Sequence, residues 1–178
     1  MALGDDLERI AAAAAAHGQV TAVLAAEPAS ALRRYLVALG DGEARRWLVL
    51  DDRGEAVTQR DEVRDTASIV AMCELADDLA GGGDLEQLRG QLARVRMVEQ
   101  PPGIEEAEEA ALALERVLGA PPRLATPAFL DDVGAATVAL ERALGETSSP
   151  FSAAIRGATG AVDEFVREVE RDYAVALP

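Results

Sequence analysis

Apolar and polar positions change their period once along the chain. Up to about residue 60 the apolar residues form short runs bounded by Gly, Pro and Asp, a pattern typical of β-strands. Beyond residue 60 they recur every three or four positions, as in helices with one apolar face. The pattern predicts an α+β fold that is predominantly helical. It would consist of an N-terminal helix, a small antiparallel β-meander of three to four strands, and then about five α-helices forming a bundle.

The clearest local signal is a β-hairpin. Two apolar runs, Tyr35–Leu39 and Trp47–Leu50, flank Asp41-Gly42, a pair that favours a tight two-residue turn. Such a turn would place Leu36 opposite Trp47. Because both runs are apolar at consecutive positions, we expect both faces of the hairpin to be covered by other elements.

The remaining segments give weaker signals before residue 60 and regular helix signals after it. Residues 5–17 are predicted to form the first helix, residues 19–25 either a strand or an extension of that helix, and residues 55–59 a further short strand. The later helices are expected over 61–80, from Asp84 to before Pro101, over 104–118, over 127–144 and over 150–175, with Thr126 and Ser149 as N-caps of the last two. No linker or repeat divides the chain. We therefore expect a single domain over residues 1–178, with a helix and meander in 1–60 and a helical part in 61–178.

Charge excludes two classes of partner. The chain carries 32 acidic and 17 basic residues, a net charge of −15, and every basic residue is Arg. Residues 1–60 have a net charge of −2 and residues 61–178 a net charge of −13. Such a field repels nucleic acid and anionic membranes, so we expect neither as a partner. No apolar run approaches the ~18 residues that a membrane-spanning helix needs.

Few residues suit nucleophilic or metal chemistry. Cys73 is the only cysteine, which rules out an intramolecular disulfide and favours a reducing, cytoplasmic compartment. The only histidine, His17, lies at the predicted end of the first helix, where no Cys–His or Ser–His pair can be argued. The N-terminus has no basic segment before its alanines, so no signal peptide is expected. The remaining candidates are carboxylates.

Two acidic groups have helical spacing. Glu74 and Asp77 are three residues apart in one predicted helix, and Glu105 and Glu109 begin another. Two such helices facing each other could hold Mg²⁺ or Mn²⁺ through oxygen ligands. Equally, acids favour the N-terminal end of a helix dipole or form the polar edge of an apolar helix, and then no cofactor is needed.

The E-x-x-D pair Glu74–Asp77 and the E-x-x-E pair Glu105–Glu108 or Glu106–Glu109 resemble the helical pairs in the metal site of the all-α nucleotide pyrophosphohydrolases, although their order along the chain is reversed. The resemblance implies an alternative function, a Mg- or Mn-dependent hydrolase with Glu74, Asp77, Glu105 and Glu109 as its metal ligands.

The favoured function is non-enzymatic. Arg34, Arg45 and Trp47 share one face of the predicted hairpin and are the predicted contact residues, although a place in the core is the better explanation of Trp47. Over residues 5–80, the order of helix, meander and helix in an acidic chain resembles the acidic secretion-chaperone fold, which implies a dimer that binds extended client segments. We therefore expect a cytoplasmic interaction protein, chaperone- or adaptor-like. A protein partner or a second copy would bind at the meander edge or in a groove between helices.

Overall fold

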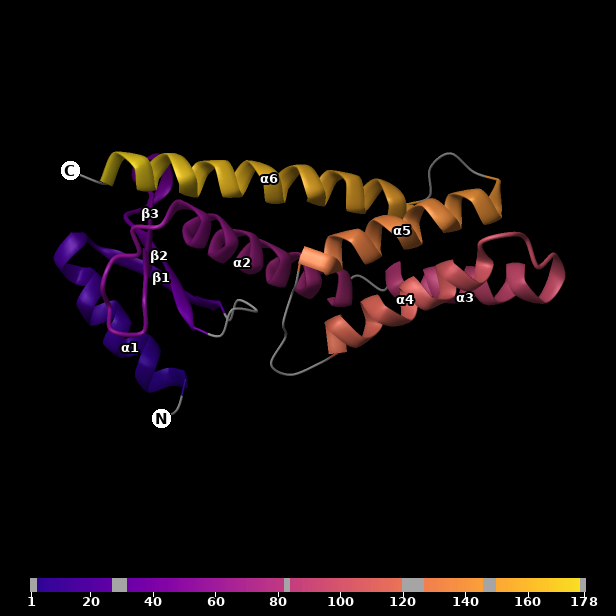
Figure 1. The fold of residues 1–178 in the computed structure, drawn as a ribbon, viewed down its shortest axis with the longest axis horizontal. Coiled ribbons are helices and arrows are strands. Elements are labelled where there is room, and N and C mark those ends of the chain that lie inside the picture. The colour runs from indigo at the N-terminus through magenta and orange to yellow at the C-terminus, as the bar shows by residue number, and fades with distance from the viewer. Residues whose placement is uncertain (1–2, 27–31, 82–83, 120–126, 146–149, 177–178) are drawn as a thin grey trace. The chain divides into compact units, whose positions relative to one another are not determined.

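The protein is described by a computed structural model that covers residues 3–26, 32–81, 84–119, 127–145 and 150–176. Over these ranges it has six α-helices and one three-stranded antiparallel sheet, which confirms the α+β, predominantly helical prediction (Figure 1). The predicted N-caps Thr126 and Ser149 lie outside the described residues.

The chain forms two compact units. The first, the sheet unit, comprises Met1–Ala71 and Asp163–Pro178, and the second, the helical unit, comprises Met72–Val162. Helices α2 (Arg60–Gly81) and α6 (Pro150–Ala176) are each divided between the units. The first half of α2 and the second half of α6 belong to the sheet unit, and the other halves belong to the helical unit. The single-domain organisation stays a prediction, and the two units are described separately below.

The sheet consists of β1 (Val20–Ala26), β2 (Arg34–Leu39) and β3 (Arg46–Leu50), in the order β1-β2-β3. The segment left open between strand and helix is therefore a strand. The predicted strand at residues 55–59 is wrong, because this segment makes only a single bridge, between Leu50 and Ala56. Helix α2 begins at Arg60, so the chain leaves the sheet before a longer ladder can form.

The hairpin register differs from the prediction by two residues. Trp47 lies opposite Ala38 rather than Leu36. A two-residue type I′ turn needs positive φ at both central positions, whereas Asp41 is extended, with φ −123° and ψ 155°. The loop instead spans residues 40–45 and contains a 3₁₀ turn. A shift of two residues keeps every side chain on its side of the sheet, so Arg34 and Trp47 still share a face.

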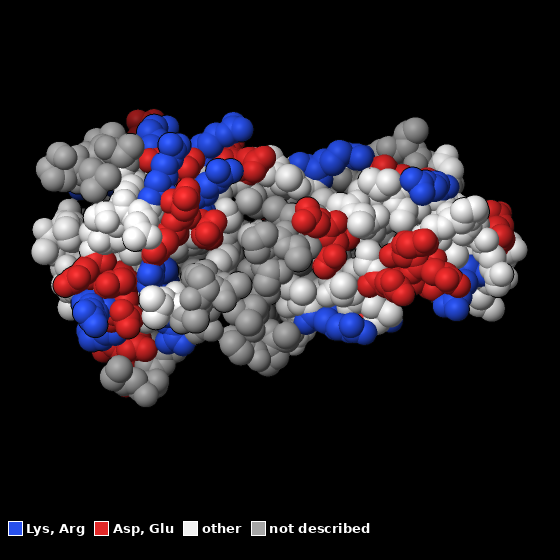
Figure 2. Space-filling model, in the orientation of Figure 1, with Lys and Arg blue, Asp and Glu red and all other residues white. Residues whose placement is uncertain are grey.

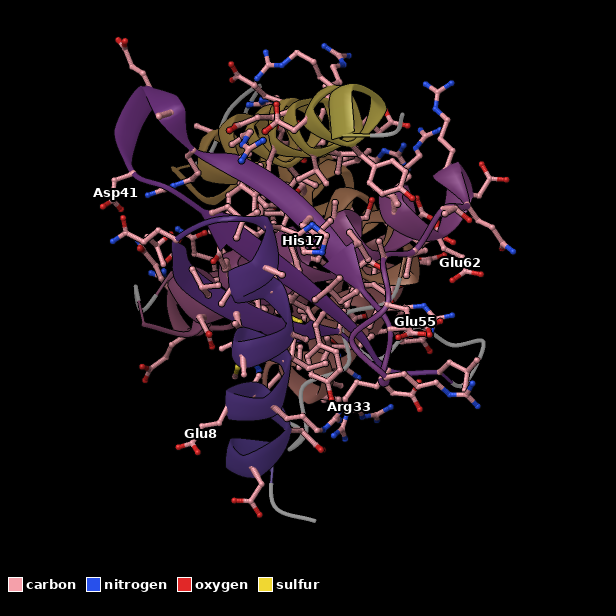
Figure 3. The ribbon with its side chains drawn as sticks, turned by 90° about the vertical axis from the view of Figure 1, so that its left-hand side faces the viewer. Glu8, His17, Arg33, Asp41, Glu55 and Glu62 are labelled. Atoms are coloured by element: carbon pink, nitrogen blue, oxygen red, sulfur yellow. The ribbon has the colours of Figure 1, made fainter. Side chains whose placement is uncertain are left out.

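One face of the sheet is covered by α1 (Leu3–Ala14), which is followed by the 3₁₀ turn Ala15–His17. Figure 3 views this unit end-on, with α1 in front of the sheet. The buried core on this side comprises Ile10, Ala14, Tyr35, Val37, Leu39, Leu48 and Leu50. Here the turn after β3 approaches α1 closely, since a Cβ added to Gly54 would lie 2.8 Å from the Cβ of Ala13.

The opposite face of the sheet is covered by the first half of α2 and the second half of α6 (Figure 1). The indole N–H of Trp47 donates to Oε1 of Glu168 at 3.1 Å, and its ring packs edge-to-face on Phe165 with centroids 5.1 Å apart. Arg34 donates through Nε and Nη2 to Glu62 Oε2, at 2.9 and 2.7 Å. Strands β2 and β3 are buried at almost every position, so the expectation that both hairpin faces are covered is confirmed.

The helical unit contains α3 (Asp84–Val98), α4 (Ile104–Gly119) and α5 (Pro127–Leu144). The apolar stripe predicted for α4 is buried at all five positions, namely Ile104, Ala107, Ala111, Leu114 and Leu118. Two ion pairs of 2.7 Å, Arg89–Glu115 and Arg96–Glu108, join α3 to α4 at the surface.

The acidic charge is shared by both units. The sheet unit has 17 acidic residues and 10 arginines, a net charge of −7, and the helical unit has 15 and 7, a net charge of −8. Figure 2 shows acidic and basic side chains on each of them. The asymmetry seen along the sequence therefore disappears in the fold, because the acidic start of α2 and the acidic end of α6 both belong to the sheet unit.

Candidate functional site

The three predicted contact residues have different environments. The Arg34 side chain is 12% exposed and is held by Glu62, and Trp47 is 8% exposed and lies in the core. Arg45 is exposed, with its guanidinium carbon 5.9 Å from the centre of the Trp47 ring. The core interpretation of Trp47 therefore fits its burial. A contact role for these residues stays a prediction, and of the three Arg45 has the most exposed side chain.

The predicted metal ligands do not form a cluster. Glu74 and Asp77 are exposed on α2, and Glu105 and Glu109 are exposed on α4. Within the described ranges, no group of three or more His, Cys, Asp or Glu side chains could hold a metal ion. The structure thus adds no support for the metal-dependent hydrolase.

Two buried polar atoms near the end of α6 were not anticipated from the sequence. The Asp172 Oδ2 atom and the Tyr173 hydroxyl have no hydrogen-bond partner among the described residues. Burial raises the pKa of Tyr173 above its usual value of 10.0. Successive residues of a helix point about 100° apart, so the two side chains do not converge on one ligand.

Two surface grooves of about 500 Å³ each lie among the described residues of the helical unit. The groove between α3 and α4 has Leu92 and Ala111 among its lining residues, and Arg96 and Glu108 at its rim are already paired with each other. The groove between α4 and α5 is lined by Glu109, which belongs to the alternative metal set, and by other residues of both charge signs. Among the described lining residues of the two grooves there is no Ser, Thr, Cys, Tyr, Lys or His side chain that could act as a nucleophile.

The outer edge of β1 lacks a backbone partner among the described residues. β1 pairs with β2 on one side, and no described backbone group pairs with it on the other. Its sequence, VTAVLAA, has no charged residue and no proline. Ala22, Val23 and Leu24 are half-buried, and Thr21 and Ala25 are exposed. The edge therefore combines unpaired backbone groups with apolar side chains that are only partly covered.

Natural proteins usually protect such an edge with lysine, proline, a bulge or a covering segment. On β1 the register shift between Val20 and Ala22 is a bulge at one end, and Ala22–Ala26 pairs regularly with β2. The regular stretch of β1 has no lysine and no proline, and no described backbone segment pairs with its outer side. It is the candidate functional site.

Sequence reasoning reached this segment without recognising it as a site. The β-branched Val20, Thr21 and Val23 indicated a strand, and the absence of charge was visible, but an extended first helix remained an alternative. A strand's position at the edge of a sheet depends on which other strands pair with it, and no local pattern reveals that.

No helix in the described ranges is long and apolar enough to span a bilayer. In comparisons with known proteins, the chain matches no protein family, no curated protein and no solved structure.

Proposed function

We propose that this protein is a non-enzymatic, cytoplasmic interaction module, adaptor-like in character, that takes up an extended segment of a partner protein along the outer edge of β1. One observation carries the proposal: β1 is an uncharged, proline-free edge strand with no described partner on its outer side. The cytoplasmic assignment rests on the single cysteine, Cys73.

The physical basis is strand addition. An extended segment that joins a sheet gains main-chain hydrogen bonds along its length, and pockets for alternate side chains determine which segment fits. On β1 those side chains point to both faces, because Val23 lies opposite Val37 on the α1 side and Leu24 lies opposite Leu36 on the other. Both are half-buried, so an added strand would cover apolar surface on each face.

The composition of the edge indicates the chemistry of the partner. β1 offers no charged side chain to form an ion pair, so it favours an uncharged segment with apolar residues on both faces. The rest of the chain is strongly acidic, which would further disfavour an acidic partner segment. We do not extend the proposal to the alternative hydrolase, because Glu74, Asp77, Glu105 and Glu109 belong to no group among the described residues that could share a metal ion.

Binding of a strand peptide tests the proposal. The probe is a fluorescent peptide copying residues 20–26, with two arginines added for solubility, and the readout is its anisotropy as protein is added. We expect saturable binding that weakens by about tenfold in Ala25→Lys, because a charge on the edge opposes strand pairing. Ala25 is exposed, so this substitution leaves the fold intact.

Two controls make the test specific. Thr58→Lys adds the same charge at an exposed position outside the sheet and should leave the affinity unchanged. A peptide with proline in place of Leu24 should not bind, since proline cannot donate to a ladder. No saturable binding, or equal weakening by both lysine variants, would contradict the proposal.

A further inference from the structure

We infer that the segment that occupies the β1 edge is β1 of a second copy of this chain. The two sheets would join across a two-fold axis into one six-stranded antiparallel sheet. This inference rests on the proposed function and names its partner.

Symmetry makes β1 a suitable ligand for itself. When two identical strands pair antiparallel about a two-fold axis, each outward N–H of one strand meets an outward C=O of the other at the equivalent position. The same patch then serves both chains, and neither retains an open outer edge on β1. The regular stretch Ala22–Ala26 is long enough for such a ladder and is free of the bulge.

The side chains on the two faces are also compatible with this pairing. With the axis at Leu24, the two Leu24 side chains meet on the face covered by α2 and α6, and Val23 of one strand lies opposite Ala25 of the other on the α1 face. All of these residues are apolar, and none is fully buried in the single chain. Pairing therefore covers apolar surface on both faces without enclosing a charge.

The β1 edge gives the charged side chains of a basic client segment nothing to pair with. A chain of net charge −15 attracts basic partners in general, but the β1 edge has no acidic residue with which such a partner could pair. Between two copies, the net charges repel while the contact itself is neutral. Because salt screens this repulsion over about 8 Å at physiological ionic strength, the dimer should become tighter as salt is added, whereas binding of a basic client should weaken.

The expected dimer has a sheet of ordinary size and a small contact area. Six strands lie within the commonest range for a sheet, which is about four to six. A contact of one short strand on each side falls below the roughly 1,200 Å² of a standard stable interface. We therefore expect a dissociation constant in the micromolar range.

Sedimentation equilibrium of the full chain tests the inference directly. We expect a monomer–dimer equilibrium that tightens between 0.05 and 0.5 M NaCl, values on the order of those over which screening changes strongly. In Ala25→Lys the dissociation constant should rise by about tenfold, while Thr58→Lys should leave it unchanged. The added lysine also makes the net charge of each chain less negative. Weaker association therefore cannot come from added repulsion between the whole chains.

Cysteine cross-linking locates the axis. Val23→Cys, Leu24→Cys and Ala25→Cys would each be made in a Cys73→Ala background and oxidised. Residues directly opposed in an antiparallel pair have Cα atoms about 4.5–5.5 Å apart, within the range that a disulfide spans. Only a position next to the axis meets its own copy, so one variant should cross-link far faster than the others, and Thr58→Cys should not cross-link.

The two proposals fail in different ways. A chain that stays monomeric at all concentrations, or that dimerises equally well in Ala25→Lys, overturns the inferred partner. If the monomer still binds the residue 20–26 peptide with the expected sensitivity to Ala25→Lys, the edge is a strand-binding site for another protein and the proposed function stands. If it binds neither, both are wrong.

Discussion

The two outer edges of the sheet differ in their backbone pairing. Beyond β3, the chain folds back so that the Val57 amide donates to the Val49 carbonyl at 2.9 Å and Ala56 bridges to Leu50. Beyond β1, no described backbone group does the same. Both strands are mainly apolar, and the only charged residue in either is Arg46 at the start of β3, so composition alone does not account for the difference.

The turn after β3 accounts for the covered edge. There Asp51 Oδ1 accepts the amides of Arg53 and Glu55 at 2.9 and 2.8 Å, and this short turn returns the chain along the strand. The return segment covers part of an edge that would otherwise invite pairing with other chains. Among the described residues one edge is partly covered and the other is not, and this is why we propose β1 as the site of association.

The largest expected effect comes from breaking the covered edge at Gly54. This residue has φ +82°, and a Cβ there would lie 2.8 Å from Ala13 Cβ on α1. Gly54→Asn should therefore lower the free energy of unfolding by about 2 kcal/mol, since the added atoms push the return segment away from the helix. Urea unfolding followed by the fluorescence of Trp47, the only tryptophan, measures the change in the sheet unit.

Gly42→Asn is the matched control for this prediction. Gly42 also has positive φ, +58°, but a Cβ added there would meet no described atom within 4 Å, and Asn tolerates this backbone region. Its cost should stay below about 1 kcal/mol. Equal losses in the two variants would show that backbone conformation, and not the approach of Gly54 to α1, sets the cost.

A smaller effect is expected when the turn after β3 loses its side-chain support. Asp51→Ala removes the acceptor of two backbone amides and should cost about 1 kcal/mol. The free energy of opening that hydrogen exchange measures at the Val57 amide should fall by the same amount. Asp52→Ala is the control, because Asp52 is exposed and its carbonyl, rather than its carboxylate, accepts the bond from Arg9. Unchanged exchange at Val57 would mean that the β3 cover is held by other contacts.

Much of the fold can be predicted from the sequence because its signals are local. The change of period near residue 60 and the apolar stripe of α4 predict elements that the structure contains. The hairpin pattern predicts the two strands correctly but not their register, because Asp41 stays extended in a longer loop than an Asp-Gly pair usually forms. The composition of the units also escapes prediction, since α6 returns to the sheet from the far end of the chain.

The candidate site is harder to predict for a related reason. On an isolated hairpin, Trp47 and Arg34 would be free to contact a partner protein. In the structure Trp47 is bonded to Glu168 and Arg34 to Glu62, on helices distant in sequence. Conversely, the open edge of β1 is defined by missing backbone pairing among the described residues. That property belongs to the arrangement of all strands and to no residue in particular.

The smallest expected effect is at Tyr173, which lies on α6 and belongs to neither edge. Its side chain is 5% exposed, and its hydroxyl has no hydrogen-bond partner among the described residues, so Tyr173→Phe should stay within about 1 kcal/mol of the parent protein at neutral pH. Burial raises the pKa of Tyr173 in the folded state above its usual value of 10.0. The folded state therefore holds this proton more tightly than the unfolded chain does. Its contribution to stability is complete below about pH 10 and is lost as the pH rises above it.

In the Tyr173→Phe variant that alkaline loss should be smaller, which unfolding in urea at neutral and at alkaline pH can measure. Dimerisation and exchange at Val57 should remain as in the parent protein, because the change leaves both edges of the sheet intact. An identical alkaline loss in the two proteins would contradict the assignment to Tyr173. Altered dimerisation would mean instead that α6 couples the two edges of the sheet. The difference between the open and the covered edge would then depend on α6 as well as on the strands.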